Sequence, residues 1–158
     1  MATTRAVIDI RRACLEDLPR ISAVMVAAFD PQFGEAWTDP QLTGMLLGSA
    51  ASLTLAYVAR QPAGFALTRT VIDETELMLL ATHPDHRDQG VATALLRAAM
   101  DDARAAGSAT MFLEVRRGNS AERLYVQHGF ACVGERREYY RGNKGQVFDA
   151  RTFRRSLG

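Results

Sequence analysis

The spacing of apolar and polar positions changes from strand-like to helix-like along the chain, most clearly between residues 77 and 107. Residues 77–81 form an apolar run that is too short for a helix and suits a buried strand. The segment that follows Gly90 has apolar residues at helical spacing, namely Val91, Leu95 and Ala99. Gly107 comes after the last helical turn, where helices commonly end. The pattern therefore predicts a strand, a tight turn at Gly90 and a helix.

The rest of the chain also divides into strand-like and helix-like segments. Helices are predicted over residues 15–29 and 120–128, and a short helix after Thr38, because Pro40 suits a first helical turn. Strands are predicted over residues 6–10, 53–59, 64–71, 75–82, 110–115, 130–139 and 146–154. Residues 30–34 are predicted as a loop, and Gln61 and Pro62 as a hairpin turn. The central strand–helix–strand unit implies local parallel pairing, so the sequence predicts an α/β fold with a mixed sheet.

Composition narrows the class of protein. The 158 residues suit a single domain over residues 1–158, with 47% hydrophobic and 23% charged residues. A net charge of +1 gives no reason to expect direct binding to nucleic acid. The two cysteines lack metal-ligand spacing, and no apolar run approaches the length of a membrane span. These features predict a cytoplasmic protein with no metal and no membrane partner.

The turn at Gly90 is a candidate anion site. The first N–H groups of a helix have no partner inside the helix, and the helix dipole places partial positive charge there. A phosphate or pyrophosphate is a natural ligand for such donors. The alternative is a strand–turn–helix unit without any ligand, which many α/β proteins contain. The turn does not match the P-loop pattern, because no Gly-Lys-Ser/Thr follows. It does not match the three-glycine dinucleotide pattern either, because Gly90 is its only glycine.

Three segments in order resemble the GNAT family of N-acetyltransferases. They are residues 87–92 at the helix start, residues 113–116 with Asn119 just beyond, and residues 124–130 with Leu-Tyr before Gly-Phe. The resemblance covers roughly residues 5–155 and extends to the RimI-type branch, which acetylates the N-terminal alanine of a ribosomal protein. Trp37-Thr38, Asp73-Glu74 and residues 136–140 carry that closer similarity. Two departures stand out, because Asp88 places an acid beside the glycine turn and Tyr125 follows Asn119 by six positions, one fewer than the RimI-type pattern.

The resemblance implies a single-domain GNAT fold, with a mostly antiparallel sheet of about seven strands, about four helices and two splayed central strands. It implies acetyl-CoA as cosubstrate. Pantetheine would pair with the backbone of one strand, and the pyrophosphate would bind the helix start. The implied coenzyme-binding residues are Leu80, Ala81, Thr82, Arg87, Asp88, Gln89, Gly90, Val91, Ala92, Thr93 and Asn119.

The resemblance also implies two catalytic residues, because an amine must lose a proton and a leaving thiolate must gain one. By similarity Glu114 is the base, through water, and Tyr125 is the acid, since a phenol keeps its proton at neutral pH. Alternatives remain open. Glu114 could be an edge charge paired with Arg116 or Arg137, and Tyr125 could be core packing. Glu76 could orient the amine or replace Glu114.

The resemblance says less about the binding site for the acceptor amine. The implied acceptor-site residues are Trp37, Glu76, Tyr139 and Tyr140. The predicted reaction is direct transfer of an acetyl group to a protein N-terminal α-amine, with ribosomal proteins among the partners, by a monomer or weak homodimer. One alternative is the same reaction on a small-molecule amine or a lysine side chain. Another is a coenzyme-A-binding module without turnover.

Overall fold

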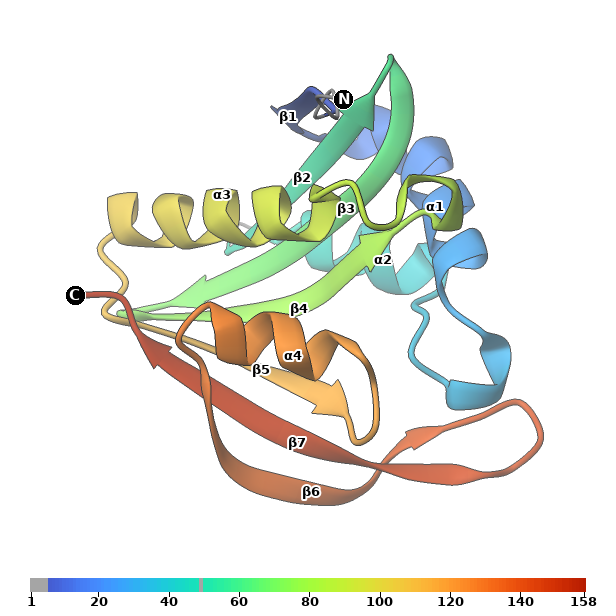
Figure 1. Ribbon diagram of the computed structural model, residues 1–158, viewed down its shortest axis with the longest axis vertical. Helices are drawn as coiled ribbons and strands as arrows, with labels where there is room; N and C mark the ends of the chain where they lie inside the picture. Colours follow the sequence, from blue (N-terminus) through green and yellow to red (C-terminus); the bar gives the residue numbers. More distant parts are fainter. Residues whose placement is uncertain (1–5, 49) are drawn as a thin grey trace, which may run out of the picture.

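A seven-stranded sheet organises the residues that the computed structural model describes, which are 6–48 and 50–158. The strand order is β1-β2-β3-β4-β5-β7-β6 (Figure 1). The strands are β1 (Ile8–Arg12), β2 (Ala51–Val58), β3 (Gln61–Val71), β4 (Glu74–Thr82), β5 (Thr110–Arg116), β6 (Ala131–Arg141) and β7 (Val147–Ser156). The helices are α1 (Leu18–Ala28), α2 (Asp39–Leu46), α3 (Val91–Ala105) and α4 (Ala121–Gln127), with single 3-10 turns η1 (Leu15–Asp17), η2 (Pro31–Phe33) and η3 (Pro84–His86).

Helices cover both faces of this sheet (Figure 1). The apolar stripe of α3 packs with Leu77, Met111 and Phe153 in one buried cluster. The apolar residues of α1 and α2 form a second cluster with Leu55, Phe65 and others on the opposite face. The predicted mixed sheet between helical layers is confirmed.

The central strands β4 and β5 separate along their length. They are parallel, and they pair only from Glu74 to Glu76 on one strand and from Thr110 to Phe112 on the other. A bulge between β3 and β4 lies just beyond that pairing, where the register shifts after Leu67. A bulge bends its strand and raises the local twist, so β4 turns away from β5. The splayed pair implied by the family resemblance is therefore present.

Local sequence signals explain where the helices begin. Thr38 caps α2 by accepting a hydrogen bond from the Gln41 backbone, and the Gln41 side chain accepts one from the Thr38 N–H in return. The long helix α3 starts at Val91 and ends before Gly107, as the periodicity predicts. The helix predicted over residues 15–29 is divided, because η1 precedes α1. The loop predicted over residues 30–34 contains the single turn η2.

The hairpin turn predicted at Gln61 and Pro62 is wrong. Strand β3 already begins at Gln61, and the turn is formed by Ala59 and Arg60, both at positive φ (49° and 67°). Two left-handed residues in a two-residue hairpin match the twist of the flanking strands. Pro62 is accommodated in the strand because it lies beside a register shift, where a missing N–H costs little.

Two loops far apart in sequence close the open end of the splayed pair. The loop between α1 and α2 meets the turn between β6 and β7, where the Asn143 N–H donates to the Pro31 carbonyl at 3.2 Å. The backbones touch so closely that a Cβ on Gly142 would collide with the Gln32 carbonyl oxygen. These contacts hold the first loop across the gap between β4 and β5. None of the described helices is long and apolar enough to cross a membrane.

Candidate active site

Two adjoining cavities occupy the gap between β4 and β5. The inner cavity is about 110 Å³, and it contains Glu76 of β4, Glu114 of β5 and Tyr125 of α4 in its wall. The outer groove is about 410 Å³ and runs past the end of β4 toward the start of α3. The residues that line both are Phe29, Glu35, Leu80, Asn119 and Ala121. A ligand lying in the outer groove therefore reaches the inner cavity at these residues.

The outer groove collects much of the implied coenzyme site. The residues of that site that line it are Leu80, Ala81, Thr82, Arg87, Ala92 and Asn119. The others, Asp88, Gln89, Gly90, Val91 and Thr93, form the turn into α3 and its first residues. The side chain of Val91 is buried in the core, so only its backbone can face a ligand. Asp88 is exposed, which suits a side chain directed to solvent.

The start of α3 leaves its backbone donors free. Gly90 precedes the helix at φ 86°, and as a glycine it supplies no side-chain cap. Ala94 donates to the Gly90 carbonyl at 3.0 Å, but within the described part of the chain no acceptor faces the N–H groups of residues 88–93. A Cβ at Gly90 would approach only Ile8 Cδ1, at 3.8 Å. An anion can therefore approach this row of donors closely.

The inner cavity brings the implied catalytic and acceptor residues together. Its wall includes Glu114, Tyr125, Trp37, Glu76, Tyr139 and Tyr140. They come from β4, β5, α4, β6 and the loop before α2, so residues up to about a hundred positions apart in sequence meet here. The placement agrees with the sequence analysis, and the individual roles stay predictions.

Tyr125 lies at the base of the inner cavity with only 6% of its surface exposed. Its ring packs edge-on against Phe130, with centroids 5.8 Å apart. Burial, and then the negative charge of Glu35, raise the pKa of the Tyr125 hydroxyl well above its ordinary value. Tyr125 therefore both packs in the core and presents a protonated phenol at neutral pH.

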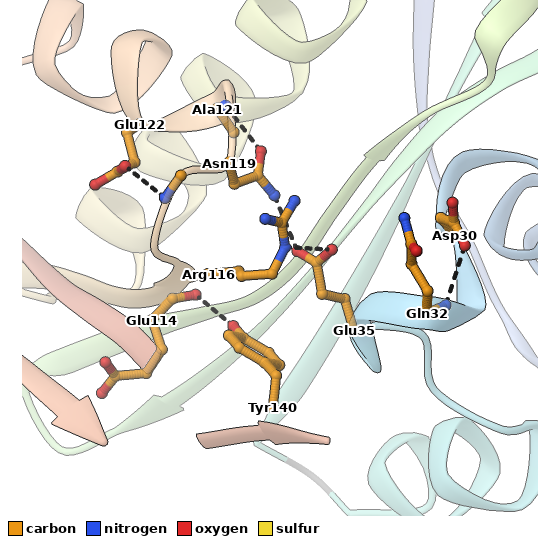
Figure 2. A network of polar contacts seen from close by, with 10 residues as sticks. Asp30, Gln32, Glu35, Glu114, Arg116, Asn119, Ala121, Glu122 and Tyr140 are labelled. Carbon is orange, nitrogen blue, oxygen red and sulfur yellow. Dashed lines mark hydrogen bonds and ion pairs between the residues drawn. The ribbon is translucent and has the colours of Figure 1, made fainter. Parts of the chain in front are cut away.

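Glu114 is held in place from the β6–β7 side of the sheet. Thr152 donates a hydrogen bond to Glu114 Oε2 at 2.5 Å, and Arg136 Nε lies 3.0 Å from Oε1. Figure 2 shows the carboxylate directed away from Glu35, while the Tyr140 hydroxyl donates to the Glu114 carbonyl at 3.2 Å. The sequence analysis considered Arg116 and Arg137 as ion-pair partners of Glu114. In the structure the partner is Arg136.

Three carboxylates of the inner cavity share one arrangement. Each is paired with an arginine that does not itself line the cavity. The pairs and their N–O distances are Arg69–Glu76 at 3.1 Å, Arg116–Glu35 at 3.2 Å and Arg136–Glu114 at 3.0 Å. The described lining contains no lysine, arginine or histidine. The wall formed by these described residues therefore presents carboxylates and no cationic side chain, which suits an amine as its occupant.

The sequence from residue 17 to residue 142 matches the family described as the acetyltransferase (GNAT) domain. The chain belongs to the GNAT acetyltransferase family. Members of this family use acetyl-CoA. The expected family and its fold class are thereby confirmed.

Several relatives of this GNAT protein are named as ribosomal protein alanine N-acetyltransferases. The Escherichia coli K12 ribosomal protein bS18-alanine N-acetyltransferase is 41% identical over 85 residues, 53% of this chain and 57% of the relative. The enzyme of the same name from Haemophilus ducreyi is 37% identical, over 64% of this chain and 72% of the relative. The crystal structure of an Escherichia coli ribosomal-protein alanine N-acetyltransferase superposes with a TM-score of 0.84 at 29% identity, covering 96% and 95% of the two chains. The first of these sequence matches thus spans little more than half of the relative's length.

Asn119, an implied coenzyme-binding residue, is hydrogen-bonded to Glu35, which the sequence analysis did not single out. The Asn119 side chain donates to Glu35 Oε2 at 2.9 Å, and its Oδ1 accepts from the Ala121 N–H at 2.9 Å (Figure 2). Sequence reasoning missed Glu35 altogether. The carboxylate lies in an irregular loop without periodicity, and no motif draws attention to it. No group of His, Cys, Asp and Glu suited to hold a metal ion occurs among residues 6–48 and 50–158.

Proposed function

We propose that this GNAT protein transfers the acetyl group of acetyl-CoA to the N-terminal α-amine of a protein, with an alanine-starting ribosomal protein as the first acceptor to test. The observation that carries the proposal is the junction of the two cavities. There a groove that leads from the free N–H groups of α3 meets a cavity that is lined by carboxylates and contains the Tyr125 phenol. The relatives named for alanine N-acetylation support this choice of acceptor.

In this proposal the coenzyme lies along the outer groove. Its pyrophosphate accepts hydrogen bonds from the backbone of residues 88–93, and its pantetheine arm runs beside Leu80, Ala81 and Thr82. The splay of β4 and β5 leaves part of the β4 backbone without a neighbouring strand on its β5 side, so an extended amide chain can pair there. The thioester then points into the inner cavity.

Transfer requires one bond to form and one to break. The lone pair of the amine attacks the thioester carbonyl carbon, and the C–S bond breaks as the tetrahedral intermediate collapses. Glu114 takes the proton that the ammonium must lose, through a water molecule, and Tyr125 gives its proton to the departing thiolate. No acyl-enzyme is needed, and Cys14 and Cys132 both lie exposed and unpaired, outside the two cavities.

The size of the inner cavity and the carboxylates that line it support a small amine acceptor. A space of about 110 Å³ admits an ammonium group and a small first side chain. Glu76 faces this space from β4 and would orient the ammonium, while Trp37, Tyr139 and Tyr140 would border the following residues. We place the reaction in the cytoplasm, where acetyl-CoA and newly made ribosomal proteins meet.

The decisive experiment measures thiol release from acetyl-CoA in the presence of a panel of amines. The panel holds peptides that start with alanine, the same peptides with a blocked N-terminus and an internal lysine, and small polyamines. Release only with a free N-terminal alanine supports the proposal. Release only with lysine or small amines moves the activity to those acceptors, and tight acetyl-CoA binding without release indicates a binding module.

A further inference from the structure

Glu35 ties the loop between α1 and α2 to the end of β5. Its side chain is only 11% exposed, and it lines both the inner cavity and the outer groove. One oxygen, Oε2, accepts a hydrogen bond from Asn119 Nδ2 at 2.9 Å, and the other, Oε1, accepts one from Arg116 Nε at 3.2 Å (Figure 2). The carboxylate therefore stands where the two proposed substrates would meet.

Arg116 is held from its other side by the same loop. Its guanidinium carbon lies 3.8 Å from the centre of the Phe33 ring, and Phe33 packs edge-on against Phe148 of β7 at 5.3 Å. A guanidinium that stacks on an aromatic face and binds a carboxylate loses much of its freedom to move. Glu35 and Phe33 thus clamp Arg116 and fix the loop against the sheet.

Glu35 also sets which way the Asn119 amide faces. A carboxylate only accepts hydrogen bonds, so it requires the NH₂ group of Asn119 on its side. The Ala121 N–H requires the Asn119 oxygen on the other side, at 2.9 Å. Both contacts select one orientation of the amide and leave one N–H and one lone pair free. Asn119 lines the outer groove, so these free groups are available to a ligand there.

We propose that Glu35 is a positioning residue for acetyl transfer, which acts through Asn119 and couples the acceptor loop to the coenzyme groove. This inference builds on the proposed function. Because one carboxylate holds both the loop beside the acceptor and the amide beside the coenzyme, ordering one side lowers the cost of ordering the other. Such coupling is reciprocal, so each substrate strengthens the binding of the other.

The first test is Glu35→Gln, read out by acetyl-CoA affinity in calorimetry. Asn119 and Arg116 donate to different oxygens of Glu35, and glutamine has an NH₂ group in place of one of them, so this NH₂ group must face one of the two donors. We expect the Kd for acetyl-CoA to rise about tenfold. The matched control is Glu74→Gln, which removes an exposed carboxylate paired with Arg154 at the far end of β4 and leaves the Kd unchanged. An equal Kd for Glu35→Gln and wild type overturns the proposal.

A donor–acceptor swap separates this contact from a general loss of folding. Asn119→Asp places two carboxylates face to face and lowers the unfolding temperature. In the double variant Glu35→Gln with Asn119→Asp, the glutamine NH₂ donates to the new carboxylate, which still accepts from the Ala121 N–H. We expect the unfolding temperature to recover while acetyl-CoA affinity stays low, because the asparagine donor is gone. Additive losses of unfolding temperature in the double variant contradict a direct contact.

Titration with coenzyme A, which carries no acetyl group to transfer, measures the coupling itself. In the wild-type protein the Kd for coenzyme A falls as the peptide concentration rises, and in Glu35→Gln it stays constant. A purely structural role for Glu35 would lower the fraction of protein that binds coenzyme A, without removing this dependence. If no amine is a substrate, the proposed function fails, and the calorimetric comparison of Glu35→Gln with wild type still decides the role of Glu35.

Discussion

Arg136 and Glu114 form an ion pair across the wall of the inner cavity, and their environments differ sharply. Arg136 Nε lies 3.0 Å from Glu114 Oε1, yet the arginine side chain is 61% exposed while the glutamate side chain is 5% exposed. The arginine therefore supplies positive charge from solvent without entering the cavity. Glu114 is left with the Thr152 hydroxyl as its buried partner. This arrangement keeps a carboxylate available beside an incoming ammonium.

Glu114→Gln is expected to lower kcat about a hundredfold at neutral pH, because the ammonium then lacks a proton acceptor. The loss should shrink as the pH approaches the pKa of the peptide amine, since free amine becomes abundant. The measurement is a pH–rate profile with an alanine-starting peptide, using Glu135→Gln as a control for removal of an exposed glutamate paired with Arg117. A loss of the same size at every pH would argue against Glu114 as the base.

Tyr125→Phe is expected to lower kcat about a hundredfold and leave the Kd for acetyl-CoA close to wild type. The phenylalanine ring keeps the packing against Phe130 and Phe153, so folding should be preserved. Rapid-quench kinetics measures kcat, and calorimetry measures the Kd for acetyl-CoA. A variant with wild-type kcat would remove Tyr125 from the reaction.

Gly90→Ala is expected to weaken acetyl-CoA binding more than it weakens folding. The left-handed φ of 86° costs an alanine about 1 kcal/mol of unfolding free energy, and relief of this strain would shift the neighbouring N–H groups that are proposed to bind the pyrophosphate. Gly107→Ala is a matched control, because Gly107 has φ 88° at the other end of α3 and a Cβ added there would meet no atom within 4 Å. Calorimetry and thermal unfolding should show similar destabilisation in both variants and loss of affinity only for Gly90→Ala. Equal affinities would contradict an anion site at this turn.

Much of this fold could be predicted because local signals agree with tertiary structure. The helical period after Gly90 and the stop at Gly107 define α3, and the Thr38 cap with Pro40 defines the start of α2. Pro62 led to a wrong prediction, since proline usually marks a turn, whereas here two left-handed residues made the turn without any glycine. The turn propensity of Pro62 was outweighed by the pairing of β2 with β3, which places this residue inside a strand.

Only those residues of the candidate site that lie in recognisable sequence motifs could be predicted. Glu114 and Tyr125 stand in segments that resemble a family pattern, and both line the inner cavity. Glu35 could not be found in this way, because its hydrogen bonds to Arg116 and Asn119 join residues 81 and 84 positions apart. The partner of Glu114 was also missed. Which arginine of β6 pairs with Glu114 depends on register shifts in the β6–β7 pair that no local pattern reveals.

Gly64→Ala is expected to lower the free energy of unfolding by about 1–3 kcal/mol through overpacking. A Cβ at Gly64 would lie 2.6 Å from the Ala81 carbonyl oxygen and 2.8 Å from Val91 Cγ1, so β3, β4 and the start of α3 must move apart. Gly134→Ala on β6 is the control, because a Cβ added there would meet no atom within 4 Å. Urea unfolding measures both. A neutral Gly64→Ala would contradict the close approach of α3 to the sheet.

Stability at high pH should depend on the buried tyrosines. Burial raises the pKa of the Tyr125 and Tyr140 hydroxyls above the ordinary value of about 10 that they have in the unfolded chain. Above that pH the unfolded chain releases protons that the folded protein retains. The contribution of these hydroxyls to the free energy of unfolding, which is fully present at neutral pH, is therefore lost as the pH rises. The unfolding temperature of the wild-type protein should therefore fall from about pH 10 upward, and Tyr125→Phe should fall less steeply because one of these groups is gone. Thermal unfolding between about pH 8 and pH 11.5 measures the two slopes, and parallel slopes would show that the Tyr125 hydroxyl is not shielded from solvent as the structure indicates.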